Sequence, residues 1–105
     1  MRRGDIYELR LPPKGVGHEQ QGRRFGAVVQ SDALLPRTVV LIAPTSTSAQ
    51  QASFRPAIEI DRQRTLVLVE HVGAVDVSRL GDLVGHLTQE ELWGIDIALG
   101  TVLDL

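Results

Sequence analysis

A succession of short apolar segments, each ending at proline, glycine or a polar run, constrains the fold more than any other feature of the sequence. Alternation of apolar and polar residues, or an unbroken apolar run between turn residues, is typical of β-strands. Five segments have this character, namely residues 5–11, 24–31, 38–44, 54–60 and 65–75. Successive strands with short connections favour a small, mostly-β barrel or sandwich with helices attached.

The strands are expected to occupy different positions in the sheet. Residues 38–44 are apolar on both faces, which predicts a central strand. Pro56 cannot donate to a ladder, so it restricts residues 54–60 to an edge or a bulge. Residues 65–75 are dense in β-branched side chains and are expected to form the strongest strand.

The C-terminal part predicts helical structure. A short helical turn near residues 78–80 and then a short strand are expected, followed by a helix within residues 88–105. Thr88 and Glu91 have the spacing of a capping box, which would satisfy two free N–H groups. Apolar residues then recur at helical intervals and predict one wide buried stripe. They are Leu92, Trp93, Ile95, Ile97, Leu99, Val102 and Leu103.

Length, composition and charge limit the class of protein. The 105 residues suit one domain spanning 1–105, and 43% hydrophobic residues can supply a core. The chain has no cysteine, so disulfides are excluded. A net charge of −2 argues against binding to nucleic acid through an overall positive field. No segment resembles a signal peptide or a membrane span, so a soluble cytoplasmic protein is expected.

Two polar segments are candidate sites. The stretch GHEQQGRRFG (17–26) places two arginines ahead of an apolar strand, and Arg24 opens that strand. A guanidinium at the mouth of a barrel can bind two phosphate oxygens at once. TSTS (45–48) follows Pro44 at another strand end and is open to two interpretations. It is either a solvated turn whose hydroxyls bond locally, or a set of groups able to hold an anion.

The histidines do not predict a metal site. His18, His71 and His86 lack the spacing of a zinc motif, and the sequence has no dinucleotide, P-loop or serine-hydrolase motif. Neither a metal nor a cofactor is therefore expected.

Taken in order, the segments resemble the MazF/PemK family of toxin endoribonucleases. The most specific stretch is G-x-E-Q-x-G-x-R-x-x-x-V-V-x-S, carried here by Gly17, Glu19, Gln20, Gly22, Arg24, Val28, Val29 and Ser31. The strand ending in Pro44-Thr45-Ser46 is the second motif. The resemblance runs through nearly the whole chain.

The resemblance implies an SH3-like β-barrel with short helices and a C-terminal helix, assembled as a homodimer. It also implies cleavage of single-stranded RNA without a metal, leaving a 2′,3′-cyclic phosphate and a 5′-hydroxyl, and inhibition by a cognate antitoxin. The substrate class, whether messenger, transfer or ribosomal RNA, stays open. The family's catalytic residues fall on Arg24, Thr45 and Glu19. The candidate RNA-binding residues are Gly17, His18, Gln20, Phe25, Gln30, Ser46 and Thr47.

Two departures from the family pattern change the expected site. His18 stands where the family has serine, so we expect an imidazole that titrates near neutral pH to touch the substrate and assist proton transfer. Phe25 replaces the proline that usually follows the catalytic arginine, and it is either a stacking surface for a base or part of the core.

A second reading is a non-enzymatic toxin of the same fold that binds a protein target such as DNA gyrase. Fold alone does not decide between the two readings. The presence of Arg24, Thr45 and Glu19 favours the ribonuclease, because a pure binding module has no need of these three residues.

Overall fold

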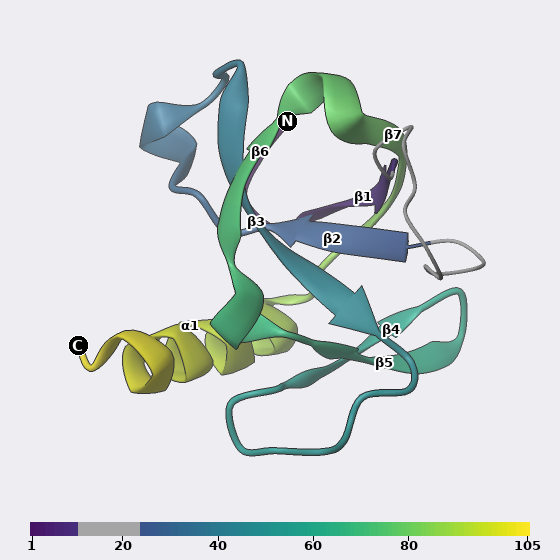
Figure 1. The fold of residues 1–105 in the computed structure, drawn as a ribbon, viewed down its shortest axis with the longest axis vertical. Coiled ribbons are helices and arrows are strands. Elements are labelled where there is room, and N and C mark those ends of the chain that lie inside the picture. Colours follow the sequence, from purple (N-terminus) through teal and green to yellow (C-terminus); the bar gives the residue numbers. More distant parts are fainter. Residues whose placement is uncertain (11–23) are drawn as a thin grey trace, which may run out of the picture.

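The computed structural model describes residues 1–10 and 24–105. Within these residues, seven strands form one curled antiparallel sheet, and a helix lies across one end of it (Figure 1). The strands are β1 (Asp5–Leu9), β2 (Arg24–Val28), β3 (Val39–Ser46), β4 (Ala57–Ile60), β5 (Gln63–Val67), β6 (Gly73–Asp76) and β7 (Leu80–His86), and the helix is α1 (Gln89–Leu103). Single 3₁₀ turns are η1 (Asp32–Leu34), η2 (Val69–His71) and η3 (Val77–Arg79). The predicted mostly-β fold with a C-terminal helix is confirmed.

The sheet has the strand order β4-β5-β3-β2-β1-β7, and β6 pairs additionally with β3. Strand β3 is central as predicted, because it pairs with β2, β5 and β6. Strand β4 begins directly after Pro56 and lies at the end of the strand order, as predicted. The predicted turn near residue 78 is η3, and the strand after it, β7, is seven residues long.

The expectation of one continuous strand over residues 65–75 is wrong. The chain runs antiparallel to β3 throughout, but it leaves the ladder at Leu68 and rejoins it as β6. The carbonyl oxygen of Pro44 accepts the Leu68 N–H at 2.8 Å. In an antiparallel strand the nitrogen and the carbonyl of one residue point to the same neighbouring strand, so the Pro44 nitrogen also faces Leu68. Because proline has no N–H to return, the ladder is interrupted there and η2 fills the gap.

Side chains are buried on both faces of the β2–β3 pair. Ala27 and Ala43 point into one apolar cluster, which also holds Ile95 of α1. Val28 and Ile42 point into a second cluster on the other face. The pairing leaves no room at Gly26, because a Cβ there would lie 2.5 Å from the Ile42 Cγ2 atom. Close approach of β2 to β3 therefore requires glycine at this position.

Helix α1 begins at the predicted capping box. The Thr88 Oγ1 atom accepts the Glu91 N–H at 3.1 Å, and the Glu91 carboxylate accepts the Thr88 N–H at 2.9 Å. The predicted width of the apolar stripe is wrong, because Trp93 and Ile97 are 57% and 72% exposed. Within the described part of the chain, no helix has the length and apolar character needed to cross a membrane.

Asp5 is a buried acid that the strand pattern did not indicate. Its side chain is 7% exposed, and its Oδ1 atom lies 2.8 Å from the His86 Nδ1 atom of β7. The Arg2 N–H donates to the other carboxylate oxygen at 2.9 Å. Burial works to raise the pKa of Asp5, but the hydrogen bonds from His86 and Arg2 outweigh it and hold the pKa below its usual value of 3.8.

We expect Asp5→Asn to destabilise the protein by about 1–3 kcal/mol at pH 7, because an amide loses the charged acceptor that His86 and Arg2 bind. A carboxylate whose folded-state pKa is depressed stabilises the fold above its unfolded-state pKa, and this contribution is lost as the pH falls through the folded-state value. Urea unfolding of both proteins at pH 7 and near pH 3 measures the difference, which should shrink in acid. Asp82→Asn, at an exposed position of β7, is the control. An equal difference at both pH values would contradict the assignment.

Candidate active site

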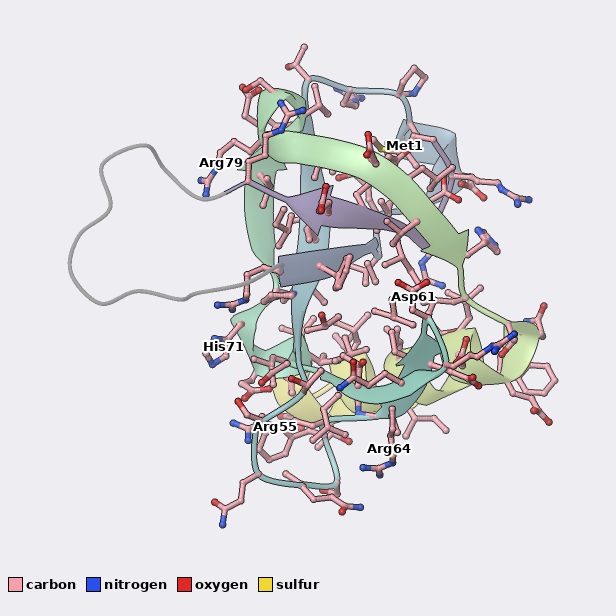
Figure 2. All side chains as sticks on the ribbon, turned by 90° about the vertical axis from the view of Figure 1, so that its right-hand side faces the viewer. Met1, Arg55, Asp61, Arg64, His71 and Arg79 are labelled. Atoms are coloured by element: carbon pink, nitrogen blue, oxygen red, sulfur yellow. The ribbon has the colours of Figure 1, made fainter. Side chains whose placement is uncertain are left out.

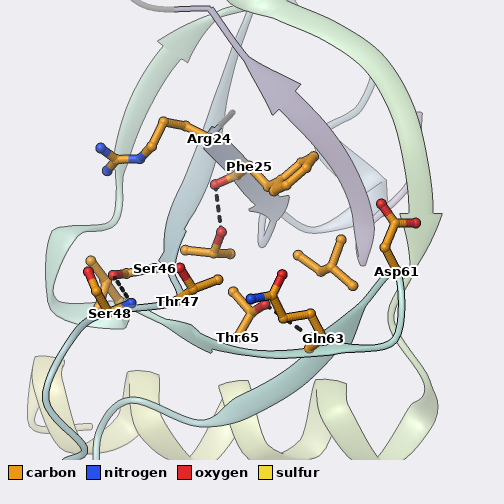
Figure 3. A pocket seen from close by; sticks show the side chains of 11 residues that line it. Arg24, Phe25, Ser46, Thr47, Ser48, Asp61, Gln63 and Thr65 are labelled. Carbon is orange, nitrogen blue, oxygen red and sulfur yellow. Dashed lines mark hydrogen bonds between the residues drawn. The ribbon is translucent and has the colours of Figure 1, made fainter. Parts of the chain in front are cut away.

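A pocket of about 650 Å³ opens where β2 and β3 end and the β4–β5 hairpin turns (Figure 3). One wall carries Arg24 and Phe25, the first two residues of β2. The floor and the adjoining rim come from Thr45 to Ser48, at the end of β3 and just beyond it. The opposite wall belongs to the hairpin and includes Asp61, Gln63 and Thr65. The pocket volume is in the range of ligand-binding clefts.

Strand pairing brings Arg24, Phe25 and Thr45 together. The β2–β3 register pairs Gly26 with Pro44, and one further step places Phe25 opposite Thr45. The Thr45 side chain is buried, and its hydroxyl donates to the Phe25 carbonyl oxygen at 3.1 Å (dashed in Figure 3). This bond closes the strand pair at its open end and holds the backbone next to Arg24. The structure thus collects in one pocket two of the predicted catalytic residues.

The segment after β3 is a tight turn. The Ser46 Oγ atom accepts the N–H groups of Ser48 and Ala49, at 3.2 and 3.0 Å. The interpretation of TSTS as a turn with local hydroxyl bonds is therefore confirmed for Ser46. Thr47 and Ser48 line the same pocket, so their part in anion binding stays a prediction.

An ion pair joins the loop between β3 and β4 to the turn η2. The Arg55 Nε and Nη2 atoms both donate to the Glu70 Oε2 atom, at 2.8 and 2.6 Å, and Nη1 donates to the Gln50 carbonyl oxygen. Burial works to raise the pKa of Glu70, but the Arg55 hydrogen bonds dominate and hold it below its usual value. The His71 Nε2 atom lies 3.6 Å from the same carboxylate oxygen. Arg55 and His71 lie on the same side of the molecule (Figure 2).

Of the remaining predicted site residues, Gln30 is described by the structure and does not line the pocket. Gln30 lies elsewhere, because its amide donates to the Leu34 carbonyl oxygen and accepts the Leu41 N–H. It therefore holds η1 against β3 and does not line the pocket. The other predicted residues lie outside the described residues, so their roles stay predictions. They are Gly17, His18, Glu19 and Gln20.

Sequence reasoning missed the hairpin side of the pocket. Asp61 and Arg62 form a two-residue turn with φ values of 53° and 66°, and Ile60 pairs with Gln63 across it. Asp-Arg is not the Asn-Gly or Asp-Gly pair that usually marks such a turn, so the residue pattern did not indicate a hairpin here. Across residues 1–10 and 24–105, no group of three or more histidine or carboxylate side chains is placed to hold a metal ion.

Comparison with known proteins identifies the family. Residues 2–103 match the family described as the PemK-like, MazF-like toxin of type II toxin–antitoxin systems. The chain belongs to this toxin family. A candidate toxin of Mycobacterium tuberculosis is 38% identical over 104 residues, which cover 98% of this chain and 97% of that protein. The endoribonuclease EndoA of Bacillus subtilis is 33% identical over 108 residues, covering 94% and 90% of the two chains.

Solved structures show the same fold in the toxin family. An endoribonuclease from a mycobacterial species, in complex with its cognate antitoxin, superposes with a TM-score of 0.79. The match covers 100% of this chain and 96% of that chain at 20% sequence identity. The resemblance of the sequence to the MazF/PemK family and the fold that it implied are thereby confirmed.

We expect Thr45→Val to destabilise the toxin by about 1–3 kcal/mol, because it removes the buried hydroxyl that donates to the partly buried Phe25 carbonyl oxygen. Thr45→Ser keeps the donor and should recover most of the loss. Thr101→Val is the matched control, since the Thr101 hydroxyl bonds the Ile97 carbonyl oxygen on the exposed side of α1. Denaturant unfolding of the three variants measures the free energies. Equal stability of Thr45→Val and Thr101→Val would show that the bond contributes nothing.

Proposed function

We propose that this chain is a MazF-like endoribonuclease toxin that cleaves single-stranded RNA by in-line attack of a ribose 2′-hydroxyl. The observation that carries the proposal is that Arg24 and Thr45, with twenty residues between them in the sequence, line one pocket because of the β2–β3 register. Membership of the toxin family and the 33% identity to the EndoA endoribonuclease support the same activity.

The chemistry assigns a role to each residue. As the 2′-oxygen bonds to phosphorus and loses its proton, the bond to the 5′-oxygen breaks and that oxygen takes up a proton. The products are a 2′,3′-cyclic phosphate and a 5′-hydroxyl. Arg24 stabilises the charge on the phosphorane oxygens, because a guanidinium stays protonated and binds two oxygens. Thr45 adds a hydrogen bond by turning its hydroxyl from the Phe25 carbonyl towards the phosphate.

Other groups complete the proposed site. Ser46 and Thr47 line the same pocket as Arg24 and bind the RNA backbone, and Phe25 supplies an aromatic surface. His18 stays the candidate for proton transfer and Glu19 the candidate for orienting Arg24, both on the sequence prediction alone. The reaction needs no metal, because its nucleophile belongs to the substrate and its charge is met by Arg24. Use of the 2′-hydroxyl restricts cleavage to RNA over DNA.

The proposal extends to the partners of the chain. A cognate antitoxin inhibits the toxin by covering the pocket, in keeping with the antitoxin complex of the mycobacterial relative. The toxin acts as a homodimer in the cytoplasm, where its RNA substrates are found. Binding of gyrase in place of RNA is the outcome that would replace this proposal.

The purified protein should cleave total RNA in the presence of EDTA, and Arg24→Ala should slow cleavage at least about 100-fold, the usual cost of removing one group that stabilises transition-state charge. Gel analysis of RNA fragments, with chemical identification of their ends, measures both.

Arg64→Ala is the matched control. Arg64 is an exposed arginine of the β4–β5 hairpin, and its side chain points away from the pocket (Figure 2). It should cleave at nearly the wild-type rate. Cleavage that EDTA abolishes, or that survives Arg24→Ala, would contradict the proposed mechanism. Intact RNA together with inhibited DNA supercoiling would replace it with gyrase binding.

A further inference from the structure

The two ends of the pocket carry opposite charge. Figure 3 shows Arg24 at one end, Asp61 at the other, and the Phe25 ring between them. Arg24 suits a phosphate, but the carboxylate of Asp61 repels one. Phosphate binding therefore does not explain why an exposed acid stands at the edge of this pocket. A group that accepts hydrogen bonds and rejects phosphate is suited to the donors on the edge of a base.

The hairpin turn fixes the position of Asp61. The turn residues Asp61 and Arg62 both have φ in the left-handed region, at 53° and 66°. Positive φ at both central residues is the geometry of a two-residue hairpin turn, and it fixes where the Asp61 side chain leaves the backbone. The pairing of Ile60 with Gln63 anchors both sides of the turn, so Asp61 and Gln63 face the pocket together. Within the described part of the chain, the Asp61 carboxylate makes no ion pair.

Phe25 provides the face on which a base could stack. Its side chain is half-buried, packs against the core cluster and lines the same pocket as Gln63. Aromatic faces hold unpaired bases in many single-strand-binding proteins, whereas hydrogen bonds to the base edge select which base is held. An aromatic face and a carboxylate in one pocket thus supply both requirements.

Resting on the proposed function, we propose that Phe25, Asp61 and Gln63 form a subsite that selects guanine next to the RNA phosphate held at Arg24. Guanine presents two adjacent donors, N1–H and the N2 amino group, which match the two oxygens of one carboxylate. Adenine and cytosine each set an acceptor beside their amino group, and uracil sets carbonyl oxygens on both sides of its N3–H. These acceptors repel a carboxylate. The Gln63 amide donates to guanine O6, and the Asp61 carboxylate accepts from N1–H and N2.

The test is cleavage of an RNA library with randomised positions, read as the frequency of each base around every cut. The wild type should prefer guanine at one position beside the cut. Asp61→Asn should reduce this preference by about 5- to 150-fold, the discrimination expected of a two-bond contact to a base. Glu59→Gln removes the same charge from an exposed position on the outer side of the hairpin and should leave the preference unchanged.

Inosine, which lacks the N2 amino group, tests the contact at the level of one atom. Replacing the selected guanine with inosine should weaken cleavage by the wild type and make little difference to Asp61→Ala. Binding of single-stranded DNA with one guanine or inosine, followed by fluorescence anisotropy, gives a readout that needs no cleavage. There the wild type should favour guanine and Asp61→Asn should not.

The outcomes separate the two proposals. A wild type that leaves RNA intact but binds guanine-containing strands through Asp61 removes the proposed function and keeps the subsite. Cleavage with no guanine preference, or with a preference that Asp61→Asn does not alter, overturns the subsite and keeps the ribonuclease. An Asp61→Asn variant that changes only the affinity for an antitoxin also overturns it, because the acid would then serve a protein partner.

Discussion

The close pairing of β2 with β3 is the constraint on which the rest of this structure depends. Gly26 has no Cβ and so leaves room for the Ile42 side chain where the two strands meet. At the end of the strand pair, the Thr45 hydroxyl donates to the Phe25 carbonyl oxygen. Apolar clusters then fill both faces of the pair, and one of them receives α1. Because the strand pair is buried on both faces, its polar residues can reach solvent only at its end, and the pocket lies there.

Pro44 has a second effect on the same pair. Its missing N–H interrupts the outer ladder, so the chain that follows β5 turns away through η2 before it rejoins β3 as β6. This turn carries Glu70, which binds Arg55 and so restrains the loop that begins at the pocket rim. Pro44 thus separates β5 from β6, and the turn between these strands carries the glutamate of the Arg55–Glu70 ion pair.

Features that depend on neighbouring residues could be predicted from the sequence, and features that depend on distant ones could not. The α1 cap needs only Thr88 and Glu91, three residues apart, and the edge position of β4 follows from Pro56. The break at Leu68 depends on Pro44 in another strand, which no pattern within residues 65–75 reveals. Exposure of Trp93 and Ile97 was missed because an apolar side chain has the same helical spacing whether or not a neighbour covers it. For the site, Arg24 and the 45–48 segment were indicated by their places at strand ends, and the family resemblance assigned catalytic roles to Arg24 and Thr45, whereas Asp61 became visible only through the fold of its hairpin.

Amide hydrogen exchange with a single-stranded RNA that cannot be cleaved, such as one with 2′-O-methyl groups throughout, measures which segments of the chain contact RNA. If RNA lies across the ends of β2 and β3 and against the β4–β5 hairpin, as proposed, residues 24–26, 45–48 and 60–65 gain protection and the exposed side of α1 gains none. Protection confined to α1, with those three segments unchanged, would contradict it.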